Sequence, residues 1–295
     1  MTILDGKKLK QEILDEVKNK IAEYNAKMKL AIIQVGNNEA SNIYIKQKLN
    51  ACEYVGIEGI LHKLDEDVPQ EELLSLIERL NNDPDVYGII LQSPIRKDLD
   101  FDYCSNQIQG DKDIDGFTRD SVYENYINEA EILPCTVKGI ITLLDKYEIN
   151  LDGANVVIVG RGNIVGKPLM LAMLNKNATV TVAHSHTKNL VDVCKNADVL
   201  ISAVGQKGLI TAEHVKEGAV VVDVGITRVD GKIYGDVDFD NVKDKASYIT
   251  PVPGGVGPLT VASIMLQMLE IYERRKANGQ NFSRRIKKGT TTSRR

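Results

Sequence analysis

Three features are missing from this chain of 295 residues, and each absence excludes a class of protein. No apolar run approaches the length of a membrane-spanning helix. The first residues, Met-Thr-Ile-Leu-Asp-Gly-Lys, lack the apolar core of a signal peptide. The four cysteines lie far apart without a C-x-x-C pair, which argues against a disulfide framework and against a zinc site. We therefore expect a cytoplasmic protein with reduced thiols, no membrane association and no bound metal.

The C-terminal segment, unlike the rest of the chain, lacks acidic residues. From Arg274 onward the chain carries nine of its 37 Lys and Arg residues and no Asp or Glu, which leaves 28 basic against 41 acidic residues before it. Residues 278–295 are also almost without apolar side chains, so we predict a basic disordered tail there. A basic tail can touch nucleic acid, but the acidic body opposes such binding. A solvated extension is therefore the favoured interpretation, and nucleic-acid binding is not expected.

Helical and strand patterns alternate along the rest of the chain, whose 43% hydrophobic and 26% charged residues are typical of a globular protein. The predicted helices cover residues 8–24, 41–54, 69–80, 136–147 and 260–275. The predicted strands cover residues 30–35, 60–64, 87–92, 155–160, 178–183, 198–203 and 219–224. Residues 249–260, rich in proline and glycine, are expected to be irregular. This order predicts two α/β domains, the second a Rossmann-type doubly wound parallel sheet, with an active-site cleft between them.

A glycine-rich turn follows the first strand of the predicted doubly wound sheet. The apolar run that begins at Asn155 stops at Gly160, and Gly162, Gly166 and Pro168 follow. Glycines let the backbone approach a pyrophosphate, and the start of the next helix offers free N–H groups to it. The spacing G-x-G-x-x-x-G is one residue longer than the usual dinucleotide fingerprint. A glycine-rich turn without a ligand is the alternative.

The next predicted strand lacks the carboxylate with which a NAD site generally binds the ribose. It ends instead in His184-Ser185-His186-Thr187-Lys188, and Arg161 lies in the glycine turn itself. A site with a guanidinium group and hydroxyl donors suits a 2′-phosphate, because it contains no carboxylate that would repel the phosphate. This chemistry favours NADP, although Ser185 and His186 alone would be typical of an ordinary polar loop.

Four further side chains are candidates for chemistry, although each alone is typical of a solvated surface residue. Within the helix at 41–54, Ile45, Leu49 and Cys52 follow the spacing of a core face, and Tyr44 and Lys48 lie four residues apart on an adjoining face. Gln92 stands at the carboxyl end of a strand, where ligands gather. Asp115 lies in a predicted turn.

The combination of these residues resembles the bifunctional methylenetetrahydrofolate dehydrogenase/methenyltetrahydrofolate cyclohydrolase family, from Leu4 to about Tyr272. The motifs that carry the resemblance are Leu4-Asp-Gly-Lys7, Val35-Gly-x-x-x-Ala-Ser-x-x-Tyr44-x-x-x-Lys48, Gln92-x-Pro94, Lys112-Asp-Ile-Asp115-Gly, Pro134-Cys-Thr136, Gly160-Arg-x-x-Ile-Val-Gly-x-Pro168, Asp223-Val-Gly-Ile226 and Pro251-Val-Pro-Gly-Gly-Val-Gly-Pro258. The last motif together with the Tyr44/Lys48 pair is highly specific.

The resemblance implies a role for each site residue. Lys48 would be the catalytic amine, with Tyr44 as its partner, Gln92 positioning it and Asp115 holding the pterin ring. The expected wall of the folate pocket comprises Gly254, Gly255, Val256 and Pro258. The expected NADP contacts are Gly160, Arg161, Gly162, Ser185 and Ile226. The implied domains are a folate-binding catalytic domain of residues 1–140 plus 259–277 and an NADP-binding domain of residues 141–258.

The implied activity is the NADP-dependent oxidation of 5,10-methylenetetrahydrofolate, followed by hydrolysis of the methenyl product to 10-formyltetrahydrofolate, by a homodimer in folate one-carbon metabolism. Hydrolysis needs a proton acceptor near neutral pH, and we expect Lys48 to alternate between its two protonation states. A dehydrogenase without the cyclohydrolase step is the alternative, but hydride transfer alone needs no base.

The sequence departs from the family pattern at three places. Ser93-Pro94-Ile95-Arg96 replaces a leucine-proline-leucine-proline run on the folate side. Gly162 replaces a common serine, which removes a hydroxyl contact to the cofactor, and Val137 replaces a common proline. We expect the first departure to affect folate affinity or the ratio of the two activities, and the second to weaken the preference for NADP over NAD.

Overall fold

The computed structural model describes residues 1–289, with the backbone alone for Ala40 and for residues 279–289. The chain packs into two compact units that are discontinuous in sequence. The six-stranded unit comprises residues 1–13 and 115–263, and the three-stranded unit comprises residues 14–114 and the chain from residue 264 onward. The predicted folate-binding domain, residues 1–140 plus 259–277, includes residues 1–13, 115–140 and 259–263, which belong to the six-stranded unit in this division.

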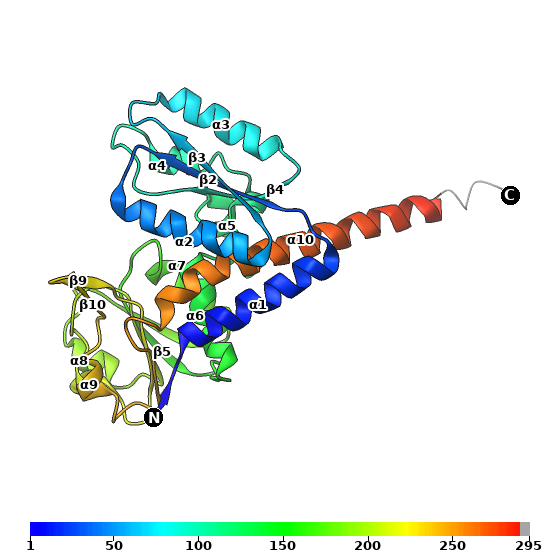
Figure 1. The fold of residues 1–295 in the computed structure, drawn as a ribbon. Helices are drawn as coiled ribbons and strands as arrows, with labels where there is room; N and C mark the ends of the chain where they lie inside the picture. The colour runs from blue at the N-terminus through cyan, green and yellow to red at the C-terminus, as the bar shows by residue number, and fades with distance from the viewer. Residues whose placement is uncertain (290–295) are drawn as a thin grey trace. The chain divides into compact units, whose positions relative to one another are not determined.

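The six-stranded unit holds a parallel sheet in the order β1-β11-β8-β7-β5-β6. Figure 1 labels its strand β5 and the neighbouring hairpin strands β9 and β10. Its strands are β1 (Thr2–Ile3), β5 (Asn155–Val159), β6 (Thr179–Ala183), β7 (Val199–Ser202), β8 (Val220–Asp223) and β11 (Tyr248–Ile249). The central strands are short apolar runs that are buried on both faces, as the strands of a parallel sheet between helices must be. The chain runs from β5 to β6 on one side and to β7 on the other. The predicted doubly wound sheet is therefore confirmed, with its switch point between β5 and β7.

Short helices and one hairpin complete this unit. The helices that lie wholly within it are α5 (Arg119–Tyr126), α6 (Cys135–Lys146), α7 (Gly166–Leu174), α8 (Leu190–Cys194) and α9 (Phe239–Val242), with a 3₁₀ turn at Ala212–His214. An antiparallel hairpin joins β9 (Thr227–Val229) to β10 (Lys232–Tyr234). The hairpin and the two-residue strands β1 and β11 were not predicted, because segments this short carry no periodicity.

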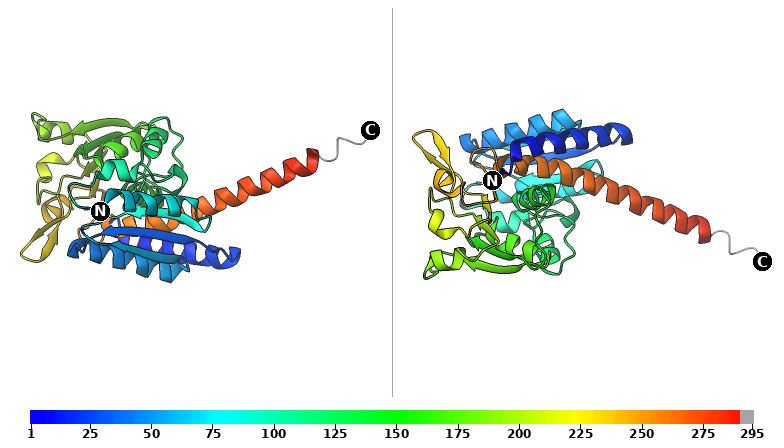
Figure 2. Two further views of the ribbon diagram at one scale, coloured as in Figure 1. Left: turned by 90° about the horizontal axis from the view of Figure 1, so that it is seen from above. Right: turned by 90° about the horizontal axis from the view of Figure 1, so that it is seen from below.

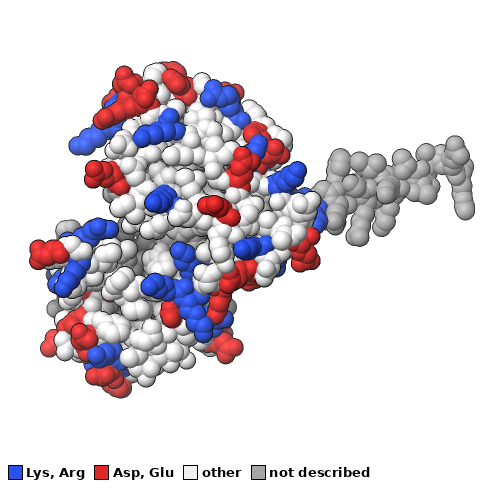
Figure 3. Space-filling view, viewed as in Figure 1, with Lys and Arg blue, Asp and Glu red and all other residues white. Residues whose placement is uncertain are grey.

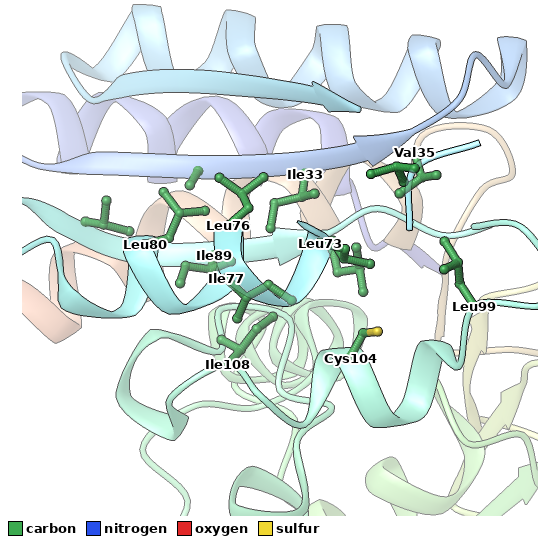
Figure 4. Close-up of a cluster of buried hydrophobic side chains, with 14 residues drawn as sticks. Ile33, Val35, Leu73, Leu76, Ile77, Leu80, Ile89, Leu99, Cys104 and Ile108 are labelled. Atoms are coloured by element: carbon green, nitrogen blue, oxygen red, sulfur yellow. The ribbon is translucent and has the colours of Figure 1, made fainter. Parts of the chain in front are cut away.

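The three-stranded unit holds the parallel sheet β3-β2-β4. Its elements are β2 (Lys29–Val35), β3 (Glu58–Leu64), β4 (Val86–Leu91), α2 (Glu39–Val55), α3 (Gln70–Asn82), α4 (Phe101–Ser105) and a 3₁₀ turn at Gly110–Lys112, with part of α1 (Gly6–Tyr24). Figure 4 shows α3 packed on one face of the sheet through Leu73, Leu76 and Ile77. On β3, Gly59 lies against Leu49 and Cys52 of α2.

The C-terminal end of α3 is held by a buried lysine. Lys112 is 4% exposed, and its ammonium group donates to the backbone carbonyls of Leu80 (3.0 Å), Asn81 (2.6 Å) and Asp83 (2.8 Å). The last carbonyls of a helix have no partner within it, so these bonds replace water that burial removes. Burial is also the main cause that lowers the pKa of Lys112. Lys112 thereby fixes the segment that leads to Asp115.

Replacing Lys112 by methionine is expected to lower the free energy of unfolding by about 2–4 kcal/mol, because it keeps the aliphatic stem but leaves buried carbonyls unpaired. Urea denaturation measures the change. Lys97→Met, at an exposed position, is the matched control and is expected to change stability by less than about 0.5 kcal/mol. Equal midpoints for the two variants would contradict this role.

The last helix is longer than predicted at both ends. Figure 2 shows α10 (Val256–Gly289) as one continuous helix, whereas the sequence predicted a helix at 260–275 and a disordered tail from residue 278. The helix starts early because Gly254 and Gly255 complete the turn before it. Residues 290–295 of the predicted tail lie outside the described residues.

Charges of both signs are interspersed on the face of the molecule drawn in Figure 3. Ion pairs such as Lys29 with Asp85 (3.2 Å) and Lys176 with Asp145 (3.1 Å) join side chains that are partly exposed. Such surface pairs contribute little to stability. Within residues 1–289, no helix is both long and apolar enough to cross a membrane.

Candidate functional site

The glycine turn after β5 is closed by backbone contacts. Gly160 has φ 122°, and its N–H donates to the Ala183 carbonyl (2.8 Å) at the end of β6. A Cβ at Gly160 would lie 2.5 Å from the Ala203 oxygen, and one at Gly166 would lie 2.3 Å from the Gly160 oxygen. Gly162 differs, because a Cβ there would meet nothing within 4 Å. The turn is thus packed at its base and open at Gly162.

Polar groups surround this opening on adjacent strand ends. Arg161 follows β5 and Ser185 follows β6, and both side chains are exposed. The strands are paired to their last residues, Val159 opposite Ala183, so these two segments begin side by side. Partial desolvation, with the nearby Arg161 guanidinium and His186, lowers the pKa of His184. A guanidinium, a hydroxyl and an open glycine fit a phosphorylated ribose next to a pyrophosphate.

The loop after β8, at the same carboxyl edge of the sheet, carries the remaining predicted cofactor residue. Ile226 follows β8 and is 50% exposed. The Thr227 hydroxyl donates to the Gly205 carbonyl (2.8 Å), which ties the loop after β8 to the loop after β7. The structure therefore places all five predicted cofactor contacts on loops that follow β5, β6 and β8 at one edge of the sheet.

Two buried carboxylates lie beneath these loops. Asp223, at the end of β8, accepts the N–H groups of Gly225 (3.1 Å), Asp236 (2.9 Å) and Val237 (2.9 Å). A Cβ at Gly235 would lie 1.9 Å from the Asp223 carboxylate, so glycine is required for this approach. Burial is the largest cause that raises the pKa of Asp223 to about 6, and the Asp236 carboxylate adds to it.

This shift has a definite sign for stability. The pKa of Asp223 is higher in the folded than in the unfolded state, so the protonated carboxyl stabilises the folded state. This stabilisation is fully present below the unfolded pKa of 3.8 and is lost as pH rises through about 6. Asparagine does not titrate, so the Asp223→Asn variant does not lose this stabilisation as pH rises. Between about pH 4.5 and about pH 7.5, the unfolding free energy of the variant relative to wild type is expected to rise by about 2 kcal/mol. Urea denaturation at both pH values measures this; parallel pH profiles would contradict it.

The proline-glycine segment before α10 packs on the start of α1. Lys7 N–H donates to the Gly254 carbonyl (3.0 Å), and a Cβ at Gly6 would lie 1.8 Å from the Gly255 oxygen. Gly254 has φ 118°. These contacts explain why the Leu4-Asp-Gly-Lys7 motif accompanies a segment far away in sequence. Of the four residues predicted to form the pocket wall, Gly255 and Val256 are buried and Gly254 and Pro258 are partly exposed.

Asp115 belongs to the six-stranded unit and is partly exposed. The Cys135 thiol, at the start of α6, donates to its Oδ1 at 3.8 Å. Gly116 has φ 70°, and a Cβ there would meet the Pro134 backbone nitrogen at 2.7 Å. The turn after Asp115 is therefore packed against the Pro134-Cys-Thr136 motif. Sequence reasoning did not assign a role to Cys135.

In the three-stranded unit, Lys48 lies on the buried face of α2. The buried positions Ser41, Ile45, Lys48, Cys52 and Val55 repeat every three or four residues. Lys48 is 8% exposed, and its Nζ donates to Gln92 Oε1 at 3.0 Å. Among the described side chains no carboxylate pairs with this ammonium. The face predicted for Lys48 was thus wrong, since the lysine shares the face of Ile45 and Cys52.

Gln92 follows β4, and its side chain is oriented by the backbone carbonyl of the next residue. Its N–H donates to Ile33 O (2.9 Å) and its Nε2 donates to Ser93 O (2.9 Å), which leaves Oε1 for Lys48. The Ser41 hydroxyl, from α2, also donates to Ser93 O (3.2 Å). The structure thus brings Lys48 and Gln92 together. Tyr44, one turn before Lys48, is 51% exposed.

The unusual Arg96 that follows Gln92 has a structural partner. Its guanidinium pairs with Asp98 and donates to the Glu66 and Val68 carbonyls before α3. It therefore ties the loop after β4 to the loop after β3.

Comparison with known proteins decides the family. The chain matches the tetrahydrofolate dehydrogenase/cyclohydrolase catalytic domain over residues 4–115 and the NAD(P)-binding domain of the same name over residues 134–276. The chain belongs to the tetrahydrofolate dehydrogenase/cyclohydrolase family. The Bifunctional protein FolD of Agathobacter rectalis is 51% identical over 276 residues, which are 92% of this chain and 99% of that protein.

Solved structures of the tetrahydrofolate dehydrogenase/cyclohydrolase family have the same fold. The bifunctional FolD enzyme of Campylobacter jejuni matches with a TM-score of 0.90 and 44% identity, covering 93% of this chain and 99% of that one. The FolD of Trypanosoma brucei, solved with NADP cofactor and an inhibitor, matches with a TM-score of 0.87 and 33% identity over 93% of this chain and 98% of that one.

The cysteines of this family member are buried and free. Burial raises the pKa of the Cys52 thiol to about 12 and that of Cys194 to about 11. Buried, protonated thiols are poor nucleophiles. In the part of the chain that the structure describes, no group of three or more His, Cys, Asp or Glu side chains is placed to hold a metal ion.

Proposed function

We propose that this protein is a bifunctional enzyme that oxidises 5,10-methylenetetrahydrofolate with NADP and then hydrolyses the methenyl product to 10-formyltetrahydrofolate. The observation that carries the proposal is the buried Lys48 amine, paired with the Gln92 amide in a chain of this family. A dehydrogenase without hydrolysis would have no use for such an amine, because hydride transfer needs no base.

Bound NADP⁺ would supply the hydride acceptor for the one-carbon bridge, and this oxidation would leave the folate as a methenyl cation. The protein's contribution to this step is to bind and orient both molecules. We propose that Arg161 and Ser185 hold the 2′-phosphate, that the backbone at Gly160 and Gly162 faces the pyrophosphate and that Ile226 contacts the cofactor. Glycine at position 162 leaves the phosphate turn open and supplies no hydroxyl.

The second step needs a group that takes and returns a proton. Water adds to the methenyl carbon, and the adduct loses a proton. The bond between the carbon and N5 then breaks, the remaining hydroxyl proton passes to N5, and the carbon becomes the N10-formyl group. We propose that Lys48 receives that proton. Gln92 supports this role because an amide oxygen orients the amine without adding a negative charge, whereas a carboxylate would favour the ammonium form.

The remaining site residues are proposed to bind the folate. Asp115 would accept two N–H bonds from the pterin ring, and its carboxylate is oriented by the Cys135 thiol. Tyr44, exposed on α2, offers an aromatic surface. Gly254 and Gly255 let a flat ring approach the backbone, with Val256 and Pro258 beside them.

One assay separates the two activities. The protein is incubated with 5,10-methylenetetrahydrofolate and either NADP⁺ or NAD⁺, and reduced cofactor and 10-formyltetrahydrofolate are recorded separately. The proposal expects both products in equal amounts with NADP⁺. The monofunctional alternative would be favoured if the methenyl absorbance accumulated at the rate of cofactor reduction and the formyl product appeared only at its spontaneous rate.

We also propose that the protein acts as a homodimer in the cytoplasm, as the family resemblance implies. Light scattering of the purified chain tests the oligomeric state. A mass of twice 32.6 kDa is expected, and a monomer at working concentrations would contradict the proposal.

A further inference from the structure

Asp236 has no role in the chemistry described so far, yet its carboxylate is completely buried beneath the loop that follows β7. Its Oδ2 accepts the Ser202 hydroxyl (2.9 Å) and the Val204 N–H (2.8 Å), and its Oδ1 accepts the Gln206 N–H (2.7 Å). No Lys or Arg side chain among those described forms an ion pair with it. Three donors therefore satisfy this carboxylate, since each of its oxygens accepts at least one hydrogen bond.

The loop that Asp236 holds, residues 203–206, lies at the switch point of the sheet. Ala203 N–H donates to Val159 O (2.8 Å) at the end of β5, and its carbonyl faces Gly160. On the other side, Val224 N–H donates to Ser202 O (2.8 Å). Ligands of doubly wound sheets bind at this point, outside the carboxyl ends of the strands.

A dinucleotide that places its 2′-phosphate beside Arg161 and Ser185 must extend across the glycine turn toward β7 and β8. Its nicotinamide half would then lie near the loop 203–206 and the loop at Ile226. Val204 is 41% exposed and Ile226 is 50% exposed there, so both offer apolar surface to a ring. The position of Val204 is set directly by the bond from its N–H to Asp236.

Glycine makes this arrangement possible. A Cβ at Gly225 would lie 2.0 Å from Asp236 Oδ1, so only glycine lets the carboxylate reach under both loops. Asp236 is itself held from behind, because its N–H donates to Asp223. Asp223 thus fixes Asp236, and Asp236 fixes the loop after β7.

We propose that Asp236 is a positioning residue for the nicotinamide half of the cofactor, and that it acts by fixing the loop 203–206. The inference rests on the proposed function and deepens it. Asparagine at this position keeps the shape but replaces one acceptor oxygen by an NH₂ group, which must face at least one of the three donors. The loop then shifts, while the folate-binding residues Lys48 and Gln92 lie in the other unit.

The test compares Asp236→Asn with Asp240→Asn, a neighbouring exposed aspartate that pairs with Lys243. NADPH affinity is measured by fluorescence titration. Dehydrogenase kcat and KM are measured with varied NADP⁺, and the rate of hydrolysis is measured with purified methenyltetrahydrofolate in the absence of nucleotide. Asp236→Asn is expected to weaken NADPH binding about tenfold or more and to lower dehydrogenase kcat/KM for NADP⁺ by about 10²-fold, with hydrolysis within about twofold of wild type. Asp240→Asn is expected to match wild type.

Thr227→Val is a milder second variant, which removes only the hydroxyl bond to Gly205 at the same loop. It is expected to shift NADPH affinity in the same direction by a smaller factor. Unchanged NADPH affinity in both variants would overturn the inference, and so would an equal loss of both activities, which indicates a general structural role. A wild-type protein that binds NADPH but performs neither reaction would instead overturn the proposed function.

Discussion

Replacing Lys48 by methionine is expected to lower the rate of methenyltetrahydrofolate hydrolysis by about 10³-fold, within the range that a positioned acid–base group contributes. Methionine keeps the length and apolar stem of the side chain, so the buried face of α2 stays filled. It cannot accept a proton or donate to Gln92 Oε1. Hydride transfer needs no base, so dehydrogenase activity is expected to fall far less.

Lys46→Met is the matched control for this experiment, because Lys46 is exposed on the same helix. Both activities of the control are expected to equal those of wild type. Rates are followed by the loss of methenyl absorbance and by the appearance of NADPH. Undiminished hydrolysis in Lys48→Met would show that another group takes the proton.

Replacing Gly160 by alanine is expected to lower dehydrogenase kcat/KM by about 10²-fold, since a misplaced turn disturbs the reacting geometry. The backbone there has φ 122°, and the new Cβ would lie 2.5 Å from the Ala203 carbonyl oxygen. Either the turn or the loop after β7 must move. The strain is expected to lower stability by about 1–3 kcal/mol as well.

Gly162→Ala serves as the control within the same turn. Its Cβ meets nothing within 4 Å, and Gly162 is not among the residues with positive φ, so the fold and its stability should be unchanged. Thermal unfolding and NADPH titration distinguish the two variants. If Gly160→Ala bound NADPH as tightly as wild type, the packed base of the turn would have no part in binding.

The sequence predicted most of the secondary structure because its strongest signals are local. The β-branched runs that form β5, β7 and β8 are continuous, and Gly56, with φ 87°, ends α2. Glycines at 160, 162 and 166 marked the phosphate turn. The two-residue pairing of β1 with β11 joins residues 246 positions apart, so no local pattern could reveal it.

The interior of the site was less predictable, because long-range bonds decide it. Helical periodicity treats lysine as a surface residue, and only the bond to Gln92, 44 residues away, explains why Lys48 is buried. Asp236, in the segment Tyr-Gly-Asp-Val-Asp, is indistinguishable in sequence from the exposed aspartates nearby. Its burial depends on Gly225 and on the loop after β7, which converge on it only in the fold.

The most direct test of this account uses purified 5,10-methenyltetrahydrofolate and no nucleotide. The wild-type chain should convert it to the 10-formyl compound much faster than buffer alone, and Lys48→Met should reduce that conversion nearly to the buffer rate. A wild-type rate equal to that of buffer would contradict the assignment of the Lys48–Gln92 pair to hydrolysis.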